Sequence, residues 1–194
     1  METVLLCVLA YFLGSIPCGV LLARARNIDI RQQGSGNIGA TNVARILGKK
    51  AGAVTLLGDM AKGCVTVLIA DYWTHQPEIV ALAGLMAFLG HLYSVFLKFK
   101  GGKGVATGLG IFLYLMPIAA LCTVIAFSIA LWATAYVSIG SITASLLLPV
   151  FGWALGAPLP YIYCSMVIAL FVLYKHRDNV QRLRAGTEAR FLRK

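Results

Sequence analysis

Residues 105–174 read VATGLGIFLYLMPIAALCTVIAFSIALWATAYVSIGSITASLLLPVFGWALGAPLPYIYCSMVIALFVLY and contain no Asp, Glu, Lys, Arg or His. A helix that crosses a bilayer needs about 20 consecutive apolar residues, so this segment has room for three or four crossings. Its long apolar runs do not alternate with polar residues, as the strands of a membrane barrel would. The segment therefore predicts an all-α integral membrane protein.

The composition of the whole chain agrees with this fold class. Of the 194 residues, 59% are hydrophobic and 12% are charged, and the mean hydropathy is +0.82. A soluble globule could not bury so large an apolar fraction. The cysteines lie one or two per apolar segment, with no C-x-x-C pair and no histidine at metal-ligand spacing, so we expect no bound metal. They are Cys7, Cys18, Cys64, Cys122 and Cys164.

Three more apolar segments precede this block, at residues 4–22, 51–73 and 79–97. The first has the length of a signal peptide. However, its basic residues follow the apolar run, and the sequence GSIP at residues 14–17 interrupts it. We therefore predict that it is a true membrane span.

The positions of Lys and Arg predict the topology. All of them except Lys62 lie in the first loop, in the loop near residue 100 or in the tail, whereas the turn at residues 71–78 has two acids and neither Lys nor Arg. The positive-inside rule places those three basic segments in the cytoplasm. Breaks at residues 116–117, 136–140 and 156–160 divide the late block into four helices, the first of them short. We predict seven transmembrane helices with the N-terminus outside and the C-terminus cytoplasmic, in one domain of residues 1–194.

The net charge of +10 is then mostly one basic face. Topogenic charge and attraction to anionic lipid would explain that face without a binding site. Two of the three basic segments are also rich in glycine, which neither explanation requires.

The loop near residue 100 reads KFKGGKGVAT, residues 98–107. Gly101, Gly102 and Gly104 allow backbone N–H groups to turn toward one point, and Lys103 lies among them where a helix is expected to start. This pattern is typical of a phosphate cradle. It is not a Walker A loop, because it lacks G-x-x-x-x-G and a Ser or Thr directly after the Lys.

The first loop contains GSGNIGATNVAR, residues 34–45. Its start fits G-x-G-x-x-G, and Asp59 follows about 20 residues later, as in a dinucleotide-binding fingerprint. That motif needs a preceding buried strand, whereas these glycines lie between two predicted membrane helices. What remains is either a turn with helix caps or a polar, ligand-binding loop. Its polar side chains are Ser35, Asn37, Thr41, Asn42 and Arg45.

The tail contains HRDNVQRLRAGTE, residues 176–188. His176, Asn179 and either Gln181 or Arg182 recur at about helical spacing, so they form one polar stripe. The stripe could face back under the helices or lie on the lipid surface as a basic helix.

Two further sets of ionisable residues lie inside predicted spans. Asp59 and Lys62 are three residues apart and can face each other, and such a pair is unfavourable enough in a membrane to need a reason. We favour a structural ion pair over a catalytic role. His91 is either a buried hydrogen-bonding histidine or a wall of the site.

Several chemistries are excluded by the motifs that the sequence lacks. Ser35 is not in a G-x-S-x-G elbow, and no H-E-x-x-H is present. No histidine is followed by an Asp five residues later, as in a common class of acyl-CoA-dependent acyltransferases. The hydrogen-bond donors and cations that remain suit anion binding and the stabilisation of developing negative charge.

The motifs GSGNIGATNVAR, GHLYSVFLKFKGGKGVAT and HRDNVQRLRAGTE, in this order, resemble those of the bacterial acyl-phosphate:glycerol-3-phosphate acyltransferases. GDMAKG at residues 58–63 also looks like this family, and the match spans essentially the whole chain. The resemblance implies transfer of a fatty acyl group from acyl phosphate to the 1-hydroxyl of sn-glycerol 3-phosphate, giving lysophosphatidic acid, the first acylation of bacterial phospholipid synthesis. It also implies a multi-pass protein of the bacterial cytoplasmic (inner) membrane whose active site faces the cytoplasm.

The resemblance and the residue types together assign expected roles. The glycerol 3-phosphate anion would bind Arg45, Lys103 and the glycines Gly101, Gly102 and Gly104. His176, Asn179 and Ser141 would position the glycerol hydroxyls, and Arg182 would assist binding. Ser35, with Asn37 and Thr41, would contact the acyl phosphate or the developing oxyanion. Asp59, Lys62 and Glu188 would be structural, with Glu188 tying the tail to the body.

The hydroxyl proton has two possible acceptors, His176 and an oxygen of the acyl phosphate. We favour the phosphate oxygen, since no carboxylate stands near a histidine in sequence. A covalent acyl-Ser35 route is disfavoured because no activating base is visible.

The rival interpretation is a transporter or binding protein for a phosphorylated metabolite, with the basic loops as its vestibule. It predicts ionisable or polar residues along the late helices, where residues 105–174 have no ionisable ones. For the enzyme we expect a monomer that needs no cofactor, metal or nucleic acid.

Overall fold

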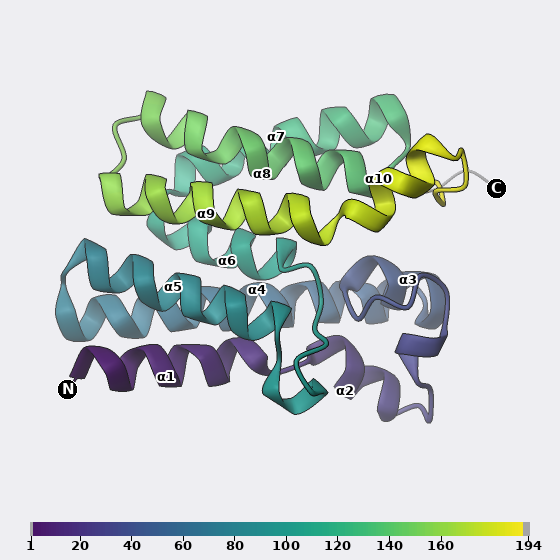
Figure 1. The fold of residues 1–194 in the computed structure, drawn as a ribbon, viewed down its shortest axis with the longest axis horizontal. Coiled ribbons are helices and arrows are strands. Elements are labelled where there is room, and N and C mark those ends of the chain that lie inside the picture. Colours follow the sequence, from purple (N-terminus) through teal and green to yellow (C-terminus); the bar gives the residue numbers. More distant parts are fainter. Residues whose placement is uncertain (1, 192–194) are drawn as a thin grey trace. The chain divides into compact units, whose positions relative to one another are not determined.

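The computed structural model describes residues 2–191, and every regular element within that range is a helix (Figure 1). The predicted all-α class is therefore confirmed for the described part of the chain. The chain divides into two compact units, Met1–Leu115 and Met116–Lys194.

The first unit is built around three long helices, α1, α4 and α5. α1 packs against α5, and α4 packs against both α5 and α6. The elements of this unit are α1 (Glu2–Ser15), α2 (Cys18–Arg24), η1 (Ile30–Gln32), α3 (Ala40–Leu47), α4 (Lys49–Thr74), α5 (Pro77–Leu92), η2 (Val95–Leu97) and α6 (Val105–Leu115).

The first apolar segment is broken where the sequence analysis noted GSIP. α1 ends at Ser15 and α2 begins at Cys18. Pro17 lacks a backbone N–H and cannot continue the hydrogen-bond ladder of α1. The carbonyl groups at the end of α1 must therefore find other partners inside the protein.

The second unit is a sequence of antiparallel apolar helices. α7 packs against α8, and α8 packs against α9. The helices end and restart at the breaks predicted for residues 116–117 and 156–160, whereas the break predicted for residues 136–140 lies at residues 135–136. Pro117 and Pro160 lie in first turns, where a missing N–H is tolerated. The elements are α7 (Pro117–Thr134), α8 (Val137–Ala154), α9 (Leu159–Lys175) and α10 (Arg177–Arg184).

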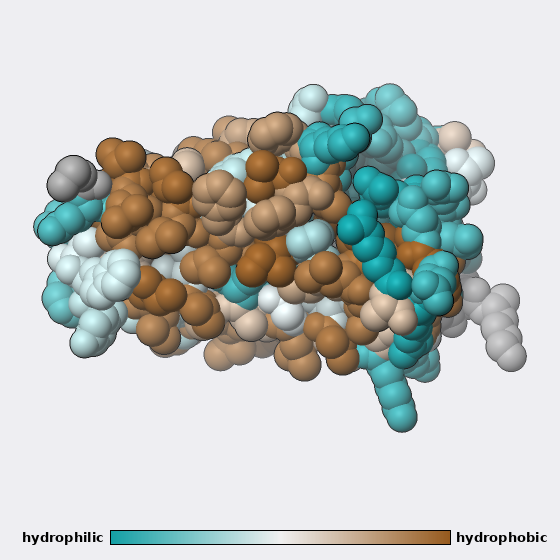
Figure 2. All heavy atoms as spheres, turned by 90° about the horizontal axis from the view of Figure 1, so that it is seen from below, coloured by the Kyte–Doolittle hydropathy of each residue, from teal (hydrophilic) through white to brown (hydrophobic). Residues whose placement is uncertain are grey.

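Within residues 2–191, five helical segments are long and apolar enough to cross a membrane, and a sixth is added if α9 and α10, bent by 49°, are one span. The α6 helix is apolar but shorter. Figure 2 shows a face covered mainly by apolar residues, with hydrophilic residues gathered toward the ends. Exposed apolar side chains of α1 include Val4, Leu5 and Phe12. The five segments are Glu2–Arg24, Lys49–Thr74, Pro77–Leu97, Pro117–Thr134 and Val137–Ala154.

The segment between α2 and α4 is folded rather than an open loop. Partly buried side chains of α2 and α3, namely Leu22, Ile46 and Leu47, pack against a buried apolar cluster. This cluster gives the polar residues of the first loop a rigid base. Its buried members are Val20, Ala23, Ile30, Ile38, Val43, Ala51 and Leu97.

Candidate active site

Asn42 organises the first loop. It lies in the first turn of α3 and is 2% exposed. Its Nδ2 donates to the carbonyl oxygens of Gln33 and Asn37, each at 2.9 Å, and its Oδ1 accepts the backbone N–H of Ser35 at 3.0 Å. Of the two interpretations that the sequence left open, a turn with caps and a ligand-binding loop, the Asn42 side chain fits the first, since it holds the loop backbone.

The predicted site residues of the first loop lie around this anchor. Ser35 is exposed, and Asn37 and Thr41 are partly buried. Thr41 and the exposed Arg45 are four residues apart on α3 and so share one helix face. The loop and α3 thus present hydroxyls and an amide near the start of the helix and a guanidinium in its last turn.

The glycines of the second loop are packed more tightly than the sequence suggested. The N–H groups of Gly101 and Gly102 donate to the carbonyl oxygens of Leu92 and His91, each at 3.1 Å. The expectation that these two amides turn toward a phosphate is therefore wrong for this structure. A Cβ at Gly101 would collide with the His91 carbonyl oxygen, and a Cβ at Gly102 would collide with Nε2 of the His91 ring.

Lys103 and Gly104 lead directly into α6. Gly104 has φ of 81°, and a Cβ there would collide with the Phe88 ring. Lys103 is partly buried, and α6 begins two residues later at Val105. A lysine beside the N-terminus of an 11-residue helix is a combination that suits an anion, because the first turn of a helix and its dipole both favour negative charge.

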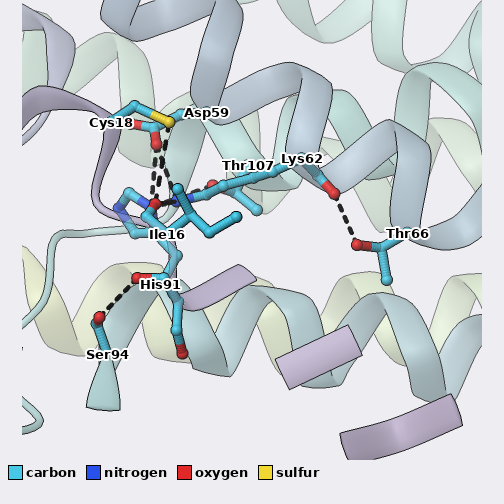
Figure 3. A network of polar contacts seen from close by, with 9 residues as sticks. Ile16, Cys18, Asp59, Lys62, Thr66, His91, Ser94 and Thr107 are labelled. Atoms are coloured by element: carbon cyan, nitrogen blue, oxygen red, sulfur yellow. Dashed lines mark hydrogen bonds and ion pairs between the residues drawn. The ribbon is translucent and has the colours of Figure 1, made fainter. Parts of the chain in front are cut away.

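Asp59, Lys62 and His91 form a buried polar network (Figure 3). The predicted ion pair is present, with Lys62 Nζ 2.9 Å from Asp59 Oδ1. Lys62 Nζ also lies 2.9 Å from His91 Nδ1 and donates to the Ile16 carbonyl oxygen at 2.7 Å. Of the two alternatives for His91, the structure shows the buried hydrogen-bonding histidine. Thr107, with Oγ1 3.2 Å from the same His91 nitrogen, was not singled out from the sequence.

Glu188 organises the tail of the second unit. Its carboxylate accepts hydrogen bonds from Asn179 Nδ2 at 2.6 Å and from Arg182 Nε at 2.7 Å. Burial raises the pKa of Glu188, but the hydrogen bonds from Asn179 and Arg182 outweigh it and lower the pKa below its ordinary value. Arg182 therefore belongs to the predicted polar stripe, whereas Gln181 is exposed.

The end of the tail folds back onto the turn between α7 and α8. The Phe191 N–H donates to the Ala135 carbonyl oxygen at 2.7 Å, and Arg190 Nε lies 3.3 Å from the Tyr136 hydroxyl. Residues 185–191 thus connect α10 to the start of α8.

His176 stands between α9 and α10 and is 3% exposed. Its Nδ1 lies 2.8 Å from the Val172 carbonyl oxygen, which can only accept, so the ring proton is on Nδ1. Nε2 is then the nitrogen that can accept a proton or a hydrogen bond. Asn179 is three residues further along the same face, and Ser141 is buried in α8.

No group of three metal-ligating side chains occurs among residues 2–191. The carboxylates of Asp59 and Glu188 are paired with neighbouring side chains. The predicted substrate-binding side chains of both units are hydroxyls, amides, an imidazole and cations. Such groups can bind phosphate and orient hydroxyl groups.

A family model described as "Glycerol-3-phosphate acyltransferase" matches residues 4–186. The chain belongs to the glycerol-3-phosphate acyltransferase family. A family member from Geobacter sulfurreducens is 50% identical over 191 residues, covering 98% of both chains. One from Geobacter metallireducens is 55% identical over 183 residues, covering 94% of both.

Two solved structures of the same family are also similar. Both are crystal structures of PlsY, described as an integral membrane glycerol 3-phosphate acyltransferase, and both are 40% identical to this chain, covering 98% of it and 96% of PlsY. The TM-score is 0.94 for the glycerol 3-phosphate form and 0.91 for the lysophosphatidic acid form. The predicted family is confirmed, and the chain is an integral membrane acyltransferase.

Proposed function

We propose that the enzyme transfers a fatty acyl group from acyl phosphate to the 1-hydroxyl of sn-glycerol 3-phosphate, forming lysophosphatidic acid and inorganic phosphate. The similarity to PlsY carries this proposal, since its two structures are a glycerol 3-phosphate form and a lysophosphatidic acid form. Those molecules are the acceptor and the product of one acylation. Family membership also favours this reaction over transport of a phosphorylated metabolite.

The proposed setting is the bacterial cytoplasmic membrane, with the active site facing the cytoplasm. Counting the short α6 with the other apolar segments gives seven spans, with the N-terminus outside and the C-terminus inside. The distribution of Lys and Arg supports this topology. We further propose that the chain acts as a monomer and forms a single domain of residues 1–194.

Arg45, Lys103 and the N-terminus of α6 are proposed to bind the phosphate of glycerol 3-phosphate. The two side chains supply positive charge, and the first turn of α6 supplies N–H groups. Gly101, Gly102 and Gly104 contribute mainly by shape, because they allow the chain to pass close to His91 and Phe88.

Residues of the second unit are proposed to orient the glycerol hydroxyls. Glu188 holds Nδ2 of Asn179, which directs Oδ1 away as a hydrogen-bond acceptor. His176 contributes Nε2, and Ser141 contributes a hydroxyl. Arg182, whose Nε is held by Glu188, adds positive charge on the same side of α10.

The chemistry needs little acid or base catalysis, since phosphate is a good leaving group. The 1-hydroxyl oxygen attacks the acyl carbonyl carbon, a C–O ester bond forms, and the bond from that carbon to the phosphate oxygen breaks. The hydroxyl proton passes to an oxygen of the departing phosphate, with His176 Nε2 as the alternative acceptor. Ser35, Asn37 and Thr41 stabilise the acyl phosphate or the oxyanion, and holding the two reactants together supplies most of the acceleration.

The test is to give detergent-purified enzyme labelled glycerol 3-phosphate with either palmitoyl phosphate or palmitoyl-CoA and to measure lysophosphatidic acid. Product from the phosphate alone is expected. Product from the CoA ester alone would overturn the proposed donor, and product from neither with folded protein would overturn the proposed reaction. Trapping an acylated Ser35 after mixing enzyme with acyl phosphate would replace direct transfer by a covalent route.

A further inference from the structure

The Lys62 side chain makes polar contacts with its own helix α4, with α5 and with the break after α1. Its ammonium lies 2.9 Å from Asp59 on α4, 2.9 Å from His91 on α5 and 2.7 Å from the Ile16 carbonyl oxygen after α1. The contacts with His91 and Ile16 are hydrogen bonds, and the contact with Asp59 is an ion pair. The side chain is 6% exposed, so these contacts are shielded from water.

The contact with Ile16 explains why a lysine is placed here. α1 ends at Ser15, and Pro17 supplies no N–H, so the last carbonyl groups of α1 lose their helical partners. The Ser94 hydroxyl donates to the Ser15 carbonyl oxygen at 2.6 Å, and the Ile16 carbonyl oxygen accepts from Lys62 at 2.7 Å and from the Cys18 N–H at 3.2 Å. A cation at a helix C-terminus also interacts favourably with the helix dipole.

The contact with His91 favours one form of the imidazole. Nδ1 of His91 lies 2.9 Å from Lys62 Nζ and 3.6 Å from Asp59 Oδ1. Because an ammonium can only donate, the closer contact fits a neutral ring with its proton on Nε2. Nε2 points at Gly102, where it occupies the space that a side chain would need. The carbonyl group of the same His91 accepts the Gly102 N–H at 3.1 Å.

His91 therefore contacts Gly102 through both its ring and its backbone, one residue before Lys103. Thr107, in the first turn of α6, lies 3.2 Å from the same ring nitrogen that Lys62 binds. The ring thus lies between the glycine segment and the start of α6. Any rotation of this imidazole would displace both sides of the proposed phosphate site.

We propose that Lys62 and His91 are positioning residues for the acceptor substrate. Lys62 holds the His91 ring in one orientation, and His91 sets the position of residues 101–104 and hence of Lys103. This role goes beyond an ion pair that only stabilises the fold, and it rests on the proposed binding of the glycerol 3-phosphate phosphate by Lys103.

The decisive variants separate positioning from folding. His91→Asn keeps an acceptor oxygen for Lys62 but removes the ring beside Gly102. The double variant D59N/K62M removes both charges together, which avoids leaving one buried charge unpaired. Thr66→Val is the matched control, since Thr66 is buried one turn further along α4 and its hydroxyl bonds only the Lys62 carbonyl oxygen among the contacts of Figure 3.

Three quantities are measured for each variant: the KM and kcat for glycerol 3-phosphate at saturating palmitoyl phosphate, the unfolding midpoint in detergent, and deuterium uptake of residues 98–104. We expect H91N and D59N/K62M each to raise KM by about tenfold while kcat changes by less than about threefold. In both variants the amide hydrogens of Gly101 and Gly102 should exchange with deuterium faster than in the original enzyme. T66V should keep the KM of the original enzyme. The triple variant D59N/K62M/H91N should be no worse in KM than the worse parent, since Lys62 acts through His91.

An unchanged KM in H91N, or a KM defect in the triple variant equal to the product of the two separate defects, would overturn the proposal. Lower unfolding midpoints with unchanged KM would assign the network to stability alone. A Lys103→Gln variant with raised KM in the same assay would show that the proposed function stands even if the positioning role fails. An original enzyme with no product from either donor would overturn the proposed function, and deuterium uptake would still test the effect of His91 on the loop.

Discussion

Asn179 Nδ2 lies 2.6 Å from Oε1 of Glu188, and this bond determines which way the Asn179 amide faces. A carboxylate can only accept, so the NH₂ group points to Glu188 and the carbonyl oxygen points away from it. Residue 188 lies beyond α10, whereas Asn179 is within it. The fold of the tail therefore controls the orientation of a residue proposed to bind substrate.

Replacing Glu188 by Gln should lower the free energy of unfolding of the enzyme and make it less dependent on pH. Because hydrogen bonds hold the folded-state pKa of Glu188 below its ordinary value, its carboxylate stabilises the fold above the unfolded pKa of about 4.3. That contribution is lost as the pH falls through the lower folded-state pKa. The expected loss at pH 7 is about 1 to 3 kcal/mol, measured by thermal unfolding in detergent.

The free energies of unfolding of the original enzyme and of E188Q should therefore become similar at acidic pH. A stability difference that stays constant from pH 7 to pH 3.5 would show that the charge of Glu188 does not act through Asn179 and Arg182. Arg177→Gln, which changes an exposed charge of the same helix, serves as the control.

Asn42→Ala should unfold the first loop. The variant leaves the Ser35 N–H and the carbonyl oxygens of Gln33 and Asn37 without their partner, and we expect a loss of about 2 to 4 kcal/mol with faster proteolysis of residues 30–42. Ser35→Ala keeps the backbone bond to Asn42, so it should lower kcat while the loop resists protease. Equal proteolysis of N42A and the original enzyme would refute this role for Asn42.

Arg45→Gln and Lys103→Gln should each lower kcat/KM for glycerol 3-phosphate by about tenfold to a hundredfold, since each removes a charge-assisted hydrogen bond to phosphate. Arg24→Gln removes an exposed arginine of the same basic face and should have little effect. Initial rates over a range of glycerol 3-phosphate concentrations provide the measurement. An equal decrease in all three variants would indicate general surface electrostatics instead of a site, and added salt would then reproduce it.

Gly104→Ala should be more harmful than Gly48→Ala. Both glycines have positive φ, 81° and 90°, so alanine is strained at either position by about 1 to 3 kcal/mol. Only at Gly104 would the new methyl group also collide with the Phe88 ring; at Gly48 no neighbouring atom lies within 4 Å. Unfolding midpoints and glycerol 3-phosphate KM should both change in G104A, and similar values for the two variants would argue against the collision.

The lengths of the apolar runs and the positions of the prolines were sufficient to predict the long apolar helices, but not the conformations of the loops. The uncharged run at residues 105–174 and its prolines predicted the breaks that the structure shows between α6, α7, α8 and α9. These features are local, because a proline or a missing charge acts on its own helix. The i,i+3 spacing of Asp59 and Lys62 was local as well, and their ion pair was predicted.

The unpredicted features depend on contacts between distant residues. Nothing near Asn42 in the sequence shows that Gln33 and Asn37 will turn their carbonyl groups toward it. The amides of Gly101 and Gly102 were expected to be free for phosphate, but they meet carbonyl groups at the end of α5. Nothing in the sequence indicated that Thr107 would contact His91, which lies 16 residues earlier in the chain. The roles of the site residues themselves remain predictions.

The bond from Lys62 to the Ile16 carbonyl oxygen has a consequence for how the enzyme depends on its surroundings. Where transporters interrupt a membrane helix, the exposed carbonyl groups commonly bind a sodium ion that comes and goes with the transport cycle. Here the corresponding cation is covalently attached to α4, so it cannot dissociate. The interrupted helix is thus a permanent part of the architecture, and exchanging sodium for potassium or choline in the buffer should leave it intact.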